Sequence, residues 1–143
     1  MIDDEQTIRG IVAAAQAAWN AGDADAYAAR FHADGTFTNV FGDRHVGRDA
    51  FRSRHATIFD TFAKGASASF TVERILIPSP ATALVDVNCA LKAAALPPGL
   101  SAGPDGSLRT SLLLVLVKDG GEWWIAGYHN VDVKALPGRK PEA

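Results

Sequence analysis

The chain has 143 residues, of which 48% are hydrophobic and 21% are charged. This length is enough for one domain with a hydrophobic core, and it is too short for two domains of ordinary size. The formal net charge is −2, with Arg scattered among Asp and Glu, which excludes the basic field that nucleic-acid-binding proteins use. We therefore expect a single domain over residues 1–143, without a nucleic-acid partner.

The sequence also argues against a membrane partner and against disulfides. The N-terminal MIDDEQTIRG is acidic and has no apolar signal core, and the longest apolar run, residues 112–117, has only the length of a strand. We expect a cytoplasmic protein. The single cysteine, Cys89, lies in VDVNCAL, a pattern typical of a buried strand, so we expect an inert thiol.

Helical signals dominate the first part of the chain. Acidic residues 3–5 precede apolar positions at helical spacing as far as Trp19, and Gly22 ends this first helix. Asp23 caps a short second helix over residues 24–31, and a strand is expected over residues 36–41. A third helix is expected from residue 47 or 48 to residue 62, and its apolar face carries Phe51, His55, Ile58, Phe59 and Phe62.

Four long β-rich segments follow the helices, and turn residues separate them. The last turn, Asp119-Gly120-Gly121, is typical of a hairpin. The expected strands cover residues 67–77, 82–93, 107–118 and 122–133. Helices followed by a meander of strands predict an α+β fold, with one curved antiparallel sheet and helices packed on one of its faces. The Pro- and Lys-rich residues 136–143 are expected to form a flexible tail.

The run AWNAGDADAYAARFHADGTFTNVFG, residues 18–42, resembles the opening of the nuclear-transport-factor-2-like superfamily. The segments NVFG, GRDAF and LRTSLLLVLVKDGGEWWIAGYHN are similar to the SnoaL-like polyketide cyclases and to the SgcJ/EcaC-type branch. The resemblance covers about residues 4–133. It implies a cone-shaped fold, in which three N-terminal helices pack on the concave face of the curved antiparallel sheet.

The resemblance also implies a pocket at the open end of the cone, the usual place for a ligand in such a fold. Asn39 and His55 are expected against this cavity, and Trp19 is expected in its wall. Asn39 and His55 each have an alternative role, because a buried His or Asn is often only a hydrogen-bonded core residue. Arg48, Arg52 and Arg54 fall off the apolar face of the third helix, so we expect them in solvent.

The last expected strand has two candidate inner faces. Hydrophobicity turns Trp123, Ile125 and His129 inward, whereas the resemblance turns Tyr128 and Asn130 inward. A β-bulge would let each set face inward over a different stretch. We favour Tyr128 and Asn130 in the pocket, with His129 as the second choice.

The resemblance places Asn130 where SnoaL-like cyclases keep a catalytic acid, and an amide cannot take up that proton. A catalytic pocket would then need His55 or His129 to move the proton, with Asn130 polarising the substrate. Arg109 is the basic residue that we expect to pair with an anionic ligand group, and an exposed strand-end charge is its alternative role. No motif for a metal ion, a nucleotide or another cofactor appears, so we expect none.

Three functions remain compatible with the sequence. The first is a cofactor-free acid/base enzyme of the isomerase, cyclase, dehydratase or hydrolase type, acting on a small and partly apolar molecule. The second is a non-catalytic module that binds such a ligand, and the third is a dimerisation module. We expect a homodimer formed through the outer face of the sheet.

Overall fold

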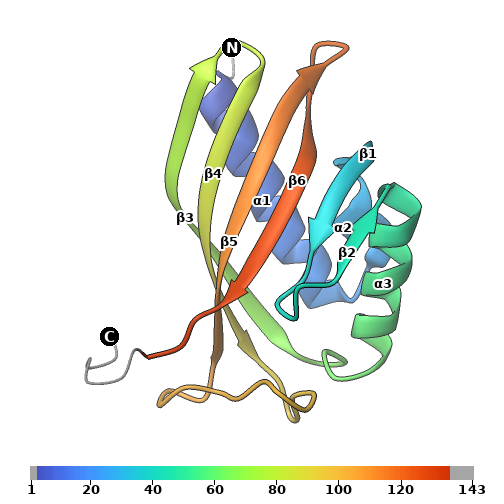
Figure 1. Cartoon of the computed structure of the whole chain (residues 1–143), viewed down its shortest axis with the longest axis vertical. Coiled ribbons are helices and arrows are strands. Elements are labelled where there is room, and N and C mark those ends of the chain that lie inside the picture. Colours follow the sequence, from blue (N-terminus) through green and yellow to red (C-terminus); the bar gives the residue numbers. More distant parts are fainter. Residues whose placement is uncertain (1–2, 136–143) are drawn as a thin grey trace.

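The computed structural model describes residues 3–135, which form three helices and six strands around a curved, open sheet (Figure 1). The helices are α1 (Asp4–Ala21), α2 (Ala24–Ala28) and α3 (Arg48–Asp60). The strands are β1 (Phe31–Thr38), β2 (Arg44–Val46), β3 (Ser67–Ser79), β4 (Thr82–Lys92), β5 (Leu108–Asp119) and β6 (Glu122–Asp132). The α+β prediction is confirmed. The tail expected over residues 136–143 lies outside the described residues.

The sheet has the strand order β2-β1-β6-β5-β4-β3. Four of the five neighbouring pairs are antiparallel, as expected, but β1 and β6 run parallel. Parallel neighbours need a long crossover connection, and here the crossover is everything between β1 and β6. The apolar pattern of a strand contains no information about the direction of a partner so distant in the sequence.

No helix within residues 3–135 is long and apolar enough to cross a membrane.

Polar side chains of α1 attach this helix to the edge strand β3. The Asn20 amide donates to the Ala68 carbonyl at 3.1 Å and accepts from the Ala68 N–H at 2.7 Å. The Gln16 side-chain oxygen accepts from the Phe70 N–H at 2.8 Å. These bonds satisfy backbone groups that the sheet leaves unpaired at its edge. They also hold the end of α1, including Trp19, over the concave face.

Strand β6 contains one extra residue relative to β5. Leu116 pairs with Ile125 and Val115 pairs with Gly127, so Ala126 is left over as a bulge. Because side chains alternate along a strand, one extra residue exchanges the inner and outer faces beyond it. Before the bulge, Ile125 is buried in the core, and after it Tyr128 is buried instead.

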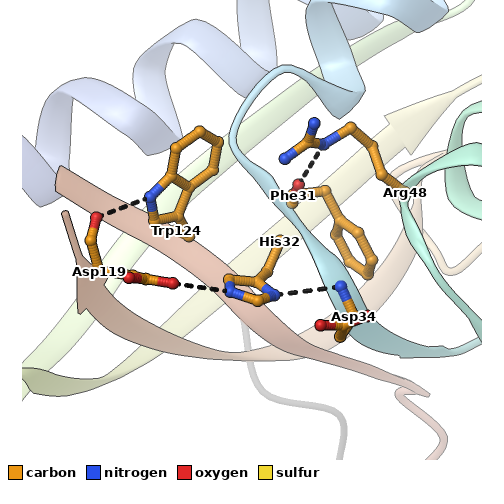
Figure 2. Close-up of polar contacts among 6 residues, drawn as sticks. All are labelled: Phe31, His32, Asp34, Arg48, Asp119 and Trp124. Atoms are coloured by element: carbon orange, nitrogen blue, oxygen red, sulfur yellow. Dashed lines mark hydrogen bonds and ion pairs between the residues drawn. The ribbon is translucent and has the colours of Figure 1, made fainter.

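A group of contacts on the outer side of β6 fixes β1 and the start of α3 (Figure 2). The Arg48 Nε donates to the Phe31 carbonyl at 2.6 Å, and its guanidinium lies 5.2 Å from the centre of the Trp124 ring. Trp124 Nε1 donates to the Asp119 carbonyl at 3.2 Å, and His32 contacts the Asp119 carboxylate at 3.3 Å. The expectation that Arg48 is a solvent residue is therefore wrong. Arg48 connects α3 to the sheet.

Gly35 lies where β1 passes the bulge, and we predict that replacing it with Ala destabilises the protein. A Cβ at this position would lie 2.8 Å from the Phe31 ring and 3.0 Å from the Ile125 carbonyl oxygen. Such overpacking typically costs about 1–3 kcal/mol. Urea unfolding of Gly35→Ala measures this loss.

Gly10→Ala is the matched control. Gly10 lies on the exposed side of α1, and a Cβ there would meet no atom within 4 Å. Because Ala has the higher helix propensity, this variant should gain about 0.5–1 kcal/mol. Equal stability of the two variants would contradict the close approach of β1 to Ile125.

Candidate functional site

A pocket lies between α3, the end of α1 and the concave face of the sheet. Its cavity volume is about 100 Å³, and the cavity opens at the protein surface. Its polar and charged lining residues are Trp19, Asn39, Arg54, His55, Thr110, Tyr128 and Asn130. Its other lining residues are Phe37, Val40, Phe41, Ile58, Phe62, Ala68, Phe70, Cys89, Ala90, Leu91, Leu100 and Leu108. Within residues 3–135, no acidic side chain lines it.

His55 lies on the apolar face of α3 and is 2% exposed. Its Nδ1 is 2.8 Å from the Phe51 carbonyl oxygen. A carbonyl only accepts, so Nδ1 carries the proton and Nε2 keeps a lone pair. Burial, with smaller contributions from Arg54 and His45, lowers the pKa of His55 to about 4 against the opposing effect of the Phe51 hydrogen bond. At neutral pH His55 is therefore an uncharged acceptor.

Tyr128 lines the pocket, and its hydroxyl contacts Tyr27, which is not a lining residue. The Tyr27 and Tyr128 hydroxyls are 2.7 Å apart, and the Tyr27 ring is 4.7 Å from the His55 ring. Burial raises the pKa of both tyrosines, so both phenols stay neutral. Because each hydroxyl has a protein partner, this pair is satisfied within the protein.

Of the three buried side-chain polar atoms that have no partner within residues 3–135, two belong to residues that line the pocket, and the third is Asp132 Oδ1. Asn130 Oδ1 and Trp19 Nε1 are both fully shielded from solvent and make no hydrogen bond to any residue in the described part of the chain. Both side chains line the pocket. Buried polar groups without a partner are rare in proteins. Asn130 therefore offers a vacant acceptor beside the cavity, and Trp19 a vacant donor.

Asn39 has the structural role that its sequence position allowed, and it also lines the pocket. Its side-chain oxygen accepts from the Phe41 and Asp43 N–H groups, each at 3.0 Å, and thereby shapes the turn after β1. Its NH₂ group has no acceptor among residues 3–135, and Asn39 lines the pocket. The amide thus satisfies the backbone with one end and leaves two donors with the other.

The structure places two predicted site residues away from the pocket. His129 is exposed, because the bulge at Ala126 turns it to the outer face of β6. Arg109 is also exposed and pairs with Asp105, because alternation along β5 turns its neighbours Leu108 and Thr110 inward instead. Neither residue lines the pocket, and Arg109 has its alternative role of an exposed strand-end charge.

Among the lining residues that sequence reasoning missed is the charged one, Arg54. Arg54 lines the cavity, although its position beside the apolar face of α3 indicated a solvent residue. A long side chain can reach a neighbouring opening from an exposed position. The available signal was its place next to His55 in the chain.

Cys89 lies in the pocket wall, where burial raises the pKa of its thiol to about 12. Since the thiolate is the reactive form, this is the expected inert thiol. Across residues 3–135, no three His, Cys, Asp or Glu side chains gather in a way that could hold a metal ion.

Comparison with known proteins identifies the fold and the family. The profile of the SnoaL-like domain matches residues 12–129. A domain of unknown function with a cystatin-like fold from Nostoc punctiforme is 26% identical, with 94% of this chain and 80% of that chain covered, at a TM-score of 0.78. A protein of unknown function from Shewanella oneidensis, described as similar to nuclear transport factor 2, is 20% identical, with 91% and 100% covered, at a TM-score of 0.70.

A third solved structure, a ketosteroid isomerase-like protein from Erwinia carotovora, is 19% identical. The alignment covers 94% of this chain and 100% of that chain, at a TM-score of 0.72. No curated protein matches this chain. The likeness at this identity concerns the fold.

The low pKa of His55 predicts a specific pH dependence of stability. Between pH 6.5, its ordinary value, and about 4, the unfolded chain binds a proton here that the folded protein does not. Stability should therefore fall as the pH decreases through this window, by about 3 kcal/mol in total. Urea unfolding at a series of pH values measures the slope.

In His55→Gln this part of the slope should disappear, because no group at this position then titrates. His129→Gln, at an exposed position, should keep the slope of the unmodified protein. The same slope in His55→Gln and in the unmodified protein would contradict a neutral, buried His55.

Proposed function

This chain belongs to the SnoaL-like domain family, and on the basis of its pocket we propose that it binds a small organic molecule with a largely apolar body and a hydroxyl or N–H group. One observation carries the proposal. Asn130 Oδ1 is a buried acceptor beside the cavity, and it has no partner among residues 3–135.

In the unbound protein, the unpaired polar atoms of the pocket lining cost free energy. A buried acceptor without a hydrogen bond costs roughly 1–3 kcal/mol, and Trp19 Nε1 adds an unpaired donor nearby. A ligand that donates to Asn130 and accepts from Trp19 removes both penalties. The apolar lining favours the rest of the molecule, because binding removes apolar surface from water.

Cofactor-free acid/base catalysis is the second candidate, and the Nε2 lone pair of His55 is the observation in its favour. An efficient general base has a pKa near the working pH. The pKa of His55 is about 4, which makes Nε2 a weak base and a good hydrogen-bond acceptor. Asn130, at the position that the resemblance gives to the acid of the cyclases, cannot exchange a proton at neutral pH. Binding therefore has the stronger support.

We also propose that the outer face of the sheet pairs with a second copy of the chain. Leu113 on β5 and Val131 on β6 are 37% and 52% exposed, and Val133 follows at 52%. Side chains of this kind on adjacent strands form an apolar surface of the type that self-association covers.

Asn130→Leu tests the binding proposal, because it removes the vacant acceptor and keeps the size of the side chain. We expect the ligand-free protein to become about 1 kcal/mol more stable in urea unfolding. The stabilising thermal shift produced by 2-naphthol, an apolar probe with one hydroxyl, should be lost.

Asn39→Leu is the matched control, since the Asn39 oxygen satisfies two backbone N–H groups. This variant should lose about 1–3 kcal/mol. If Asn130→Leu destabilised the protein as much as Asn39→Leu does, Asn130 would be a structural amide and the proposal would fail.

Light scattering tests the dimer. The unmodified chain should have the mass of two copies at micromolar concentration, and Leu113→Lys should shift it to the mass of one, because a charge would be buried in the interface. The control variant Thr71→Lys, at an exposed position of β3, adds the same charge farther from the proposed surface and should leave the dimer intact. A monomeric unmodified chain would refute the pairing.

A further inference from the structure

We propose that the molecule bound in the pocket is an organic anion, with its negative group held at the mouth by Arg54 and its apolar body inside. This inference rests on the proposed binding function and adds the chemical class of the ligand. A carboxylate is the simplest group that fits. The chemistry of the pocket mouth carries the argument.

Arg54 is the charged residue of the pocket. It precedes His55 on α3, it is exposed to solvent, and it contributes to the lining. Along the part of the chain that the structure describes, no Asp or Glu lines the cavity to neutralise it. The opening therefore has one positive group beside mostly apolar walls, including the half-exposed ring of Phe41.

The guanidinium of Arg54 has no protein partner within the described residues 3–135. The other two arginines of α3 are engaged, since Arg48 donates to the Phe31 carbonyl and Arg52 lies 3.8 Å from the Asp25 carboxylate. Arg54 makes no hydrogen bond or ion pair with any residue between 3 and 135. A guanidinium presents its N–H donors in a planar fork that matches a carboxylate. Its donors are available to a ligand.

The NH₂ group of Asn39 is a second hydrogen-bond donor on the pocket lining. The Asn39 oxygen is held by two backbone N–H groups, which leaves its NH₂ group as the end available to a ligand. Arg54 and Asn39 both offer donors and no acceptor. By contrast, the buried Asn130 Oδ1 and the His55 Nε2 offer acceptors. The pocket thus suits a ligand with an acceptor group near Arg54 and Asn39 and a donor group near Asn130.

The electrostatics of the interior point the same way. Burial is the main cause of the low pKa of His55, and the positive charge of Arg54 lowers this pKa as well, so Arg54 acts on a group inside the cavity. A hydroxylated aromatic or alicyclic acid meets these demands with one negative group, one hydroxyl and an apolar frame.

The experiment compares 6-hydroxy-2-naphthoate with its uncharged methyl ester by calorimetry at low ionic strength. We expect the full chain to bind the acid about three- to tenfold more tightly than the ester, the range of an exposed, charge-assisted contact. Arg54→Gln should weaken binding of the acid by this factor and leave the ester within about twofold. Arg52→Gln removes a charge from the same helix and should change neither. Added salt should narrow the difference between acid and ester.

Two results would overturn the inference, and they are distinguishable. If acid and ester bind equally, or if Arg54→Gln weakens both alike, the anion preference is wrong and the binding function stands. If neither compound binds, nor 2-naphthol, the binding function itself fails and the anion preference fails with it.

Discussion

The extra residue in β6 allows one sheet to form both the closed core and a wall of the open pocket. Up to Ile125 the inner face of the strand packs in the core, and beyond Ala126 the residues that turn inward are Tyr128 and Asn130. The neighbouring strand β1 is also irregular beside the bulge, because its pairing with β6 shifts register between Phe31 and Thr36. A regular β6 would have turned the Asn130 side chain to the outer face. The bulge therefore separates a closed core from an open pocket.

Inside the pocket the hydrogen-bonding groups are neutral, and the charged group lies at an exposed position. The groups inside it are neutral: His55 is uncharged because burial lowers its pKa to about 4, and burial keeps Tyr128 a phenol. The full charge belongs to Arg54, at a position exposed to water. Burying a charge without a partner is far more costly than burying a neutral polar group. This arrangement avoids that cost in the unbound protein.

Local chemistry made much of the fold predictable. The acidic start of α1, its Gly22 end and the apolar face of α3 depend on residues close in sequence, so the pattern placed His55 inward correctly. The parallel pairing of β1 with β6 depends on a partner far away in the chain. The short strand β2 and the inner face of β6 depend on how a neighbouring strand pairs, which the apolar pattern does not mark. A period-two pattern cannot locate a bulge, which is why His129 was misplaced. For the same reason the pattern favoured Arg109 over Arg54, since the contacts of a long side chain depend on the neighbouring elements.

The hydrogen bonds divide the polar groups of the pocket into two sets. One set is satisfied within the protein, as in the Tyr27–Tyr128 pair and the bond from His55 to the Phe51 carbonyl. These bonds fix the shape of the wall, and removing a partner would leave a buried group unpaired. The other set has no partner among residues 3–135: Asn130 Oδ1, Trp19 Nε1 and the guanidinium of Arg54. Because the satisfied set shapes the wall, the buried atoms Asn130 Oδ1 and Trp19 Nε1 have defined positions in it. A site ordered in advance loses little conformational entropy on binding, so it can select a molecule by the positions of a few polar atoms on an apolar frame.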